Sequence, residues 1–129
     1  MKYLALTGIA NKVIYDLRDH VLRTIEIRSP HNFFTALRIK AGDMVFLTNS
    51  NTQDVTIGTI GIIAQVRNYQ IVSHKTIQSS EFFYEEIEAQ LARIQLETKG
   101  LGRVRKIECC QLGEPTIVEA DRVIYYDAR

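Results

Sequence analysis

The sequence predicts an α+β fold that is mainly β, namely a small β-barrel with two to three flanking helices. About seven short apolar segments follow one another at close spacing and are separated by turn residues, which is typical of a small barrel. Glycines interrupt one of the longer segments, as they do where a strand bends at a barrel corner. The 129 residues, of which 46% are hydrophobic, are expected to form one domain over residues 1–129.

The first expected elements are a short strand, an amphipathic helix and a second strand. Residues 2–7 form a mostly apolar run that Gly8 ends. From Ile9 to Val21 an apolar residue recurs every four positions among polar ones, which predicts a helix of about ten residues. Residues 23–29 then alternate between apolar and polar side chains, as in a half-buried strand.

A proline and a glycine turn define the next elements. Proline fits the first helical turn, so Ser29-Pro30 stops the strand and predicts a short helix over residues 31–37. After the turn at Gly42-Asp43, residues 44–48 are expected to form an apolar strand. The polar residues 49–54 are expected to form a loop.

The second half is expected to contain a hairpin, a long helix and closing strands. Residues 56–67 predict a long strand, Asn68 a turn and residues 70–77 its partner strand. Residues 81–98 carry apolar side chains three and four positions apart, which predicts a long helix that two nearby glycines end. The expected closing strands are residues 103–112, 116–120 and 122–126.

Charge and cysteine content exclude several classes of protein. The chain has 16 basic and 15 acidic residues, so it is not a strongly basic nucleic-acid coat protein, although a local basic patch stays open. The two cysteines, Cys109 and Cys110, are adjacent and badly placed for a disulfide, which suits a reducing cytoplasm. No metal-ligand spacing is present, and we expect neither a metal nor an organic cofactor.

The hydropathy pattern predicts no membrane attachment. The longest nearly apolar run, Ile60–Val66, is far shorter than the roughly 18 residues that a membrane span needs. The apolar part of the N-terminus is too short for a signal peptide. We therefore expect a cytoplasmic protein, and the oligomeric state stays open.

The strand over residues 23–29 carries the first candidate ligand-binding residues. Thr24, Glu26 and Arg28 share one face, because residues two apart on a strand point the same way. Such a face suits a polar pocket floor, where Arg28 donates to a phosphate or base edge and Glu26 accepts from an amino group. The alternative is a solvent-facing strand on which Glu26 and Arg28 form an ion pair.

Five more polar residues are candidates for the same pocket, namely Arg23 at the start of the strand, His31 and Asn32 after it, and Thr48 and Asn49 at the rim. His31 and Asn32 directly follow the strand, and a histidine there can donate, accept or titrate, or else cap or pack the helix. Thr48 and Asn49 open a polar loop that can hydrogen-bond a base or a phosphate, or form a solvated turn.

A short basic segment is a second, separate candidate surface. Arg103, Arg105 and Lys106 lie in a stretch without acidic residues, directly after the Glu-rich residues 81–97. They are candidates for contacts with a nucleic-acid backbone. The alternatives are a solubilising surface and ion pairs with the Glu-rich segment.

Three motifs carry a resemblance to a known group of folds. They are Arg23-Thr24-Ile25-Glu26-Ile27-Arg28-Ser29, Lys40-Ala41-Gly42-Asp43-Met44-Val45-Phe46-Leu47 and Gly58-Thr59-Ile60-Gly61-Ile62-Ile63-Ala64-Gln65-Val66. In this order they resemble the ASCH group of PUA-like β-barrels, where a basic-Thr-Ile-x-x-Arg strand precedes a Gly-Asp turn and a strand of the form Gly-x-x-Gly-x-x-x-x-Val. Over its whole length the sequence also resembles, more closely, the archaeal family DUF473, which carries no known activity.

The ASCH resemblance implies binding of RNA or of a modified nucleobase. A few ASCH proteins deacylate an N4-acylated cytidine, with a Lys and a Thr on the first motif strand and a downstream Glu. Here the Lys position holds Arg23 and the Thr position holds Glu26, while the following Arg is retained as Arg28. Arginine stays protonated and cannot act as a base, so the resemblance implies a shared pocket more than a shared reaction.

The sequence thus leads to one principal function and two alternatives. We expect RNA or a nucleoside- or nucleotide-type ligand to bind in a cleft beside the barrel. The first alternative is an amidohydrolase for an acylated nucleobase, with Glu26 or Glu85 as the base and Arg28 steadying the oxyanion. Glu85 has Glu88 one helical turn away, a pair that can raise one pKa or favour the helix dipole. The second alternative is a protein-interaction module without a ligand.

Overall fold

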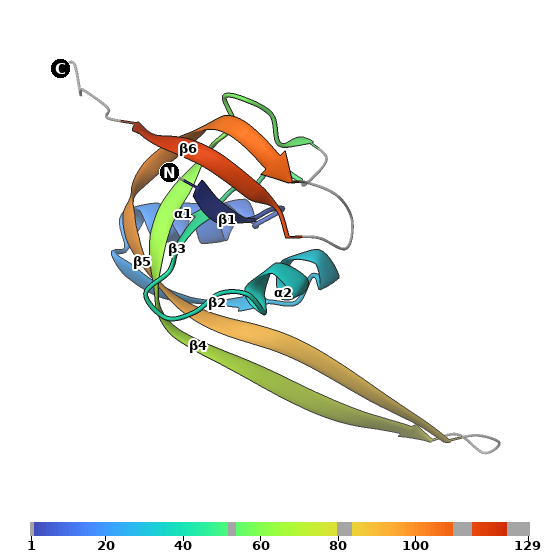
Figure 1. The fold of residues 1–129 in the computed structure, drawn as a ribbon. Coiled ribbons are helices and arrows are strands. Elements are labelled where there is room, and N and C mark those ends of the chain that lie inside the picture. Colours follow the sequence, from blue (N-terminus) through green and yellow to red (C-terminus); the bar gives the residue numbers. More distant parts are fainter. Residues whose placement is uncertain (1, 52–53, 80–83, 110–114, 124–129) are drawn as a thin grey trace.

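Six strands and two helices make up the part of the chain that the structure describes (Figure 1). The computed structural model describes residues 2–51, 54–79, 84–109 and 115–123. In chain order the elements are β1 (Lys2–Leu6), α1 (Asn11–Asp19), β2 (Leu22–Ile27), α2 (Pro30–Ala36), β3 (Met44–Leu47), β4 (Ile60–Ser79), β5 (Tyr84–Cys109) and β6 (Ile117–Val123).

Five of these strands close into a ring. β5 pairs antiparallel with β4, and β4 pairs antiparallel with β3. β3 is parallel to β1, β1 is antiparallel to β6, and β6 returns antiparallel to β5. The remaining strand, β2, pairs with residues 92–97 of β5, on the same edge that β6 occupies at residues 101–109. The parallel crossover from β1 to β3 therefore carries α1, β2 and α2 outside the ring.

Within the ring, β3 and the start of β4 are buried on both faces. Phe46 of β3 and Ile63 of β4 belong to a cluster with Tyr3, Val104 and Val118, to which all five ring strands contribute. The residues on either side of them in β3 and β4 belong to a second cluster, which joins the sheet to β2 and both helices. Burial of both faces explains why these strands are continuous apolar runs in the sequence rather than alternating ones.

Gly61 lies where β4 crosses the Phe46 ring. A Cβ at this position would come within 2.3 Å of the Leu47 carbonyl oxygen and 2.6 Å of the Phe46 ring. Its register partner on β5 is Gly102, where a Cβ would meet the end of the Ile63 side chain at 2.8 Å. Backbone cannot move aside as a side-chain tip can, so the space at Gly61 fits only glycine.

The largest departure from the sequence expectation is a two-stranded arm that β4 and β5 form beyond the ring (Figure 1). Past Ile71 and Ala92 these strands pair with each other up to Ser79 and Tyr84, and no other described strand joins them. The expected helix over residues 81–98 is therefore wrong for every described residue, because residues 84–98 are strand.

The physical reason lies in pairing between distant segments. Residues that form helices well, such as Glu, Ala, Gln and Leu, dominate this stretch, but β5 pairs with β4 on one edge and with β2 on the other. Near the ring the burial follows a period of two, with Ala92, Ile94 and Leu96 buried and Arg93 exposed between them. Tertiary pairing has overridden local propensity.

Two further expectations change with this strand. Asn68 pairs with Gln95 of β5 directly after a register shift at Arg67, so residues 60–79 are one strand rather than a hairpin turning at Asn68. Residues 103–109 continue β5, and β6 runs through Asp121 as one strand where two were expected. Parts of the expected closing strands, residues 110–112 and 124–126, lie outside the described residues, as does Cys110.

The structure confirms the elements predicted for the first half of the chain. Three strands and two helices occupy the expected positions up to residue 48, with ends displaced by one or two residues. Pro30 opens α2 directly after Ser29, as the sequence predicts. The predicted mainly-β fold is confirmed as a closed strand ring with two helices. Within the described ranges, no helix is long and apolar enough to cross a membrane.

The close approach at Gly61 gives a test of the packing. We expect Gly61→Ala to lower the free energy of unfolding by about 1–3 kcal/mol or more, because the new methyl group overpacks a rigid backbone contact. Gly102→Ala is the matched control and should cost less, because the Ile63 side chain can rotate away. Urea unfolding of both variants measures the difference, and equal losses would contradict the assignment.

Candidate functional site

A cavity of about 620 Å³ lies between β2 and the segment that leads into α1. Its size is within the range of small-molecule sites. Five of the eight expected ligand-binding residues line it, namely Arg23, Thr24, Glu26, Arg28 and Asn32. The other lining residues are Gly8, Ile9, Ala10, Val13, Ile25, Ile27 and Ser29.

The cavity follows the unpaired edge of β2. It touches every residue from Arg23 to Ser29, although successive side chains of a strand point to opposite faces. Contact with every successive residue means that the cavity reaches the backbone as well as the side chains of one face. β5 occupies one edge, and no other described strand pairs with β2. The free edge therefore faces the cavity.

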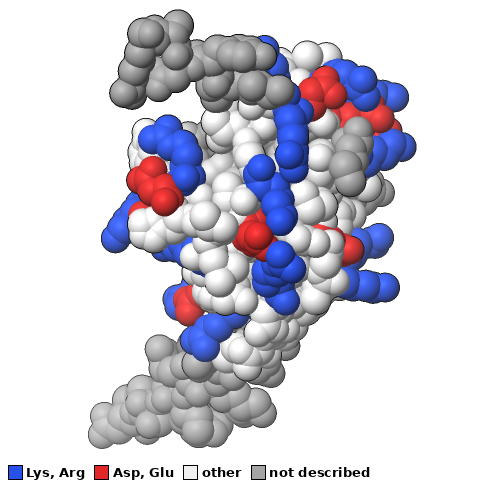
Figure 2. Space-filling view, turned by 90° about the vertical axis from the view of Figure 1, so that its left-hand side faces the viewer, with Lys and Arg blue, Asp and Glu red and all other residues white. Residues whose placement is uncertain are grey.

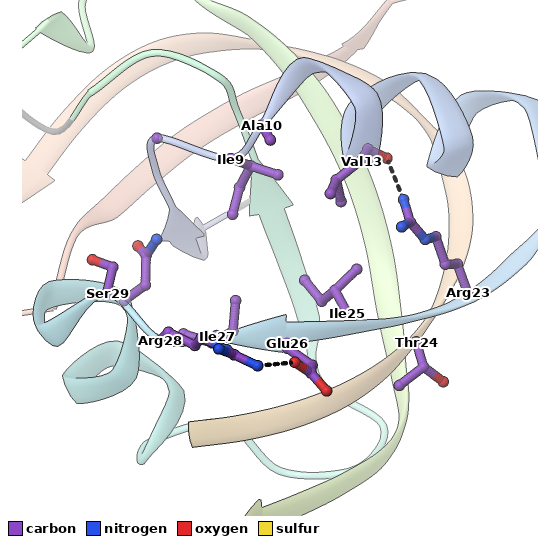
Figure 3. Close-up of a pocket in the computed structure, with 12 residues that line it drawn as sticks. Ile9, Ala10, Val13, Arg23, Thr24, Ile25, Glu26, Ile27, Arg28 and Ser29 are labelled. Carbon is purple, nitrogen blue, oxygen red and sulfur yellow. Dashed lines mark hydrogen bonds and ion pairs between the residues drawn. The ribbon is translucent and has the colours of Figure 1, made fainter. Parts of the chain in front are cut away.

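The isoleucines, rather than the polar side chains, point toward α1 (Figure 3). Ile25 and Ile27 are directed toward Ile9 and the start of α1, whereas Thr24 and Glu26 point to the opposite side of β2. The expected polar floor is thus turned away from α1. The cavity has an apolar wall on the α1 side and polar groups along the strand edge.

Both arginines of β2 are already paired. Arg23 contacts Asp16 of α1 at 2.8 Å and donates weakly to the Val13 carbonyl at 3.5 Å. Arg28 contacts Glu26 at 2.9 Å, and Arg93 of β5 reaches the other oxygen of the same carboxylate at 3.2 Å. The ion pair between Glu26 and Arg28 that the sequence left as an alternative is present.

The two guanidinium groups change the acidity of Glu26. Its pKa is lowered, chiefly by the hydrogen bond from Arg28 and further by Arg93, while partial desolvation opposes the shift. A carboxylate with a lowered pKa is a weaker base than a free one. Glu26 is therefore poorly suited to the role of general base.

Asn32 fixes the end of the cavity, whereas His31 lies elsewhere. The buried Asn32 side chain accepts from the Thr7 amide at 3.0 Å and donates to the Thr7 carbonyl at 2.6 Å, which ties α2 to the end of β1. The His31 ring lies 2.9 Å from the Thr116 hydroxyl and is not part of the cavity lining. His31 thus links α2 to the segment before β6.

The two expected rim residues belong to a different cavity. Thr48 and Asn49 line a space of about 280 Å³ together with Tyr15 and Arg18 of α1. Thr48 is buried and donates to the Ile60 carbonyl, while Asn49 donates to Asn11 at 2.7 Å. The structure therefore does not bring them together with Arg23 and Thr24.

The basic segment forms a third surface, where β5 and β6 pair. Arg103 and Arg105 line a cavity of about 350 Å³ with Arg122 and Asp121. The exposed Arg105 side chain approaches Glu119 and Asp121 at 3.7 and 4.0 Å, which are long distances for ion pairs. Lys106 is exposed and registers with Glu119. Figure 2 shows basic groups with acidic neighbours among them on one face of the molecule, rather than a uniform basic field.

Glu85 lies far from the cavity. It is in the arm, opposite Gln78, and eight positions before Arg93, which registers with Glu26. At about 3.3 Å per residue its backbone is roughly 26 Å along the strand from that point. Glu85 and Glu26 are therefore not parts of one site.

The residues that sequence reasoning missed are those on the α1 side. Gly8, Ile9, Ala10 and Val13 form one wall of the cavity, but they were assigned to a strand break and a core-facing helix. Their spacing carries no chemical signal, because apolar walls and core faces have the same pattern. Among the described residues, no group of three His, Cys, Asp or Glu side chains is placed to hold a metal ion.

Comparison with known proteins identifies the family. A family model described as a protein of unknown function, DUF473, matches residues 1–118. The chain belongs to the DUF473 family. The uncharacterized protein MJ0105 of Methanocaldococcus jannaschii is 33% identical over 108 residues, which are 84% of this chain and 68% of that protein. This confirms the DUF473 resemblance. No solved structure matches the chain significantly.

The Asn32 bridge predicts a specific loss of stability. We expect Asn32→Ala to lower the free energy of unfolding by about 1–3 kcal/mol, because two buried hydrogen bonds to Thr7 are lost. Asn49→Ala removes one exposed hydrogen bond and should change the free energy of unfolding by less than about 0.5 kcal/mol. Chemical denaturation measures both, and a similar small effect at both positions would refute the bridging role.

The lowered pKa of Glu26 predicts a pH-dependent contribution to stability. The contribution is present above the unfolded value of 4.5 and disappears as the pH falls through the lower folded value. Wild type should therefore melt slightly higher than Glu26→Gln at pH 7, and the gap should shrink as the pH falls below 4.5. Added salt should also shrink the gap, since these groups are exposed. A gap that does not change with pH would show that lost packing, not charge, is responsible.

Proposed function

We propose that this chain is a PUA-like domain of the ASCH type that binds RNA or a nucleoside-type ligand in the cavity along β2. The observation that carries the proposal is the cavity itself, which joins an apolar wall to a polar strand edge in one open cleft. Nucleobases require this combination, since they have flat apolar faces and hydrogen-bonding edges.

The fold supports the ASCH part of the proposal. The three motifs that carry the resemblance fall on consecutive strands: the first on β2, the second on the turn into β3 and the third on the start of β4. β3 and β4 are neighbours in the ring, and β2 joins them through β5. The motif strands therefore belong to one sheet, and the first of them forms the cavity edge.

The charges favour a nucleoside over a polyphosphate or a long RNA backbone. Arg23 and Arg28 are the basic residues that line the cavity, and each is paired with a carboxylate. A phosphate bound there would compete with these carboxylates for the guanidinium groups. A neutral heteroaromatic ring can enter without disturbing them. Any contact with an RNA backbone falls to Arg103, Arg105 and Lys106 on the separate β5–β6 surface.

The cavity offers little support for the amidohydrolase alternative. Glu26 is held as a carboxylate by two guanidinium groups, and Glu85 is far along the arm. Among the described lining residues, no other Asp, Glu, His, Lys or Cys is present to act as a base. We therefore propose binding rather than turnover.

A cavity-blocking variant tests the proposal. Ala10 is exposed and lines the cavity, so Ala10→Trp should fill it and abolish binding of nucleosides. A nucleoside at 100 times its dissociation constant should stabilise wild type by about 2.7 kcal/mol and raise Tm by several degrees. The measurement is a thermal-shift titration with the four ribonucleosides.

The matched control is Lys12→Trp, an exposed position two residues further along that does not line the cavity. It should bind like wild type. If no ribonucleoside raises the Tm of wild type, the proposal fails. If Ala10→Trp binds as well as Lys12→Trp, the ligand occupies another surface.

A further inference from the structure

The backbone N–H and C=O groups of β2 face its two edges in alternation, independently of where the side chains point. The Thr98 amide donates to the Val21 carbonyl at 2.8 Å, so Val21 turns its carbonyl toward β5. The register continues without a shift from Leu22 opposite Glu97 to Ile27 opposite Ala92. In an antiparallel ladder, alternate residues direct both their N–H and their C=O to the partner strand.

This alternation sorts the residues of β2 into two sets. The residues that direct their backbone groups to β5 are Arg23, Ile25 and Ile27. The residues that direct them to the free edge are Leu22, Thr24 and Glu26. Thr24 and Glu26 both line the cavity. The cavity wall therefore contains two N–H groups and two C=O groups that the β2–β5 ladder leaves unused.

We propose that the N–H and C=O of Thr24 or Glu26 recognise a nucleobase by pairing with adjacent donor and acceptor atoms on its edge. The inference rests on the proposed function and names the atoms that read the ligand. Each of these residues presents a donor and an acceptor side by side, pointing the same way. Uracil carries N3–H beside O4, and adenine carries N6–H beside N1, so either edge is complementary.

The surroundings of the edge favour a base over other occupants. A base that pairs with the strand edge has its ring faces free to pack on the apolar wall that includes Ile9 and Val13. Both arginines of the lining already pair with a carboxylate, so an anion would have to compete with Asp16 or Glu26 for them. The apolar wall and the strand edge line the same cavity, an arrangement that suits a flat ring with a hydrogen-bonding edge.

Amide hydrogen exchange followed by NMR tests this directly on the wild-type chain. Without ligand, the amides of Thr24 and Glu26 should exchange much faster than those of Ile25 and Ile27, which β5 protects. Saturating uridine or adenosine should slow exchange of Thr24 or Glu26 at least tenfold. The matched probes 3-methyluridine and N6,N6-dimethyladenosine lack the donor on the pairing edge and should not.

A proline variant gives an independent test. Thr24→Pro removes the N–H that faces the cavity, and proline is tolerated on an edge strand where that N–H is not part of the ladder. Thr24→Ala removes the same side chain and keeps the N–H. If the nucleoside protects the amide of Thr24, Thr24→Pro should bind it roughly two- to twelvefold more weakly than Thr24→Ala, because one hydrogen bond is lost. Glu26→Pro and Glu26→Ala form the equivalent pair.

The outcomes separate this inference from the proposed function. Protection of Thr24 or Glu26 that depends on the unmethylated base supports both. A nucleoside that binds in the cavity without slowing either amide overturns the edge recognition and leaves the proposed function standing. Absence of nucleoside binding overturns both. Protection of these amides by a short extended peptide, and by no nucleoside, overturns the nucleobase assignment.

Discussion

The structure depends on one strand edge that serves two partners. The edge of β5 that does not face β4 pairs with β2 at residues 92–97 and with β6 at residues 101–109. Thr98 lies between these two pairing regions. Its amide donates to the Val21 carbonyl, and its hydroxyl donates to the Leu17 carbonyl at 2.6 Å. This residue thereby fixes the end of α1 to the sheet at the point where β2 begins. Ring closure and the position of β2 are two results of the same arrangement.

The candidate site follows from this division of the β5 edge. Because β6 pairs with β5 and not with β2, the outer side of β2 has no strand among those described. The crossover segment before α1 lies beside it instead. Helices and loops cannot complete a β-ladder, so the space between them and β2 stays open. Ion pairs hold the side chains around this space, and Asn32 ties its far end to β1. The site is thus built from backbone and apolar groups more than from charged ones.

The sequence predicted the first half of the fold because its signals there are local. Pro30 after Ser29, the four-residue spacing around Leu17 and the alternation through Ile25 each depend on neighbours in the chain. The second half depends on pairing between distant residues. Ile87, Leu91 and Ile94 have helical spacing, yet they lie in β5 because β4 offers a full-length partner. The same limit applies to the site. Four of its residues were found from one polar strand, and Asn32 from its position just after that strand. Ile9 and Ala10 carry no chemical pattern, and the separation of Thr48 from Arg23 is a property of the folded chain.

Closure of the ring also sets an order of events during synthesis. The seam between β1 and β6 joins Lys2 to Glu119, so it links two of the strands most distant in the chain. Contacts between distant segments form late, because the entropy of a long loop opposes them. While the chain is still on the ribosome, β1 can pair with β3 but has no partner on its other edge until residues 117–123 have emerged. The nascent chain therefore carries an open strand edge from the synthesis of β1 until β6 has emerged, and that edge is a point at which a chaperone or another nascent chain can attach.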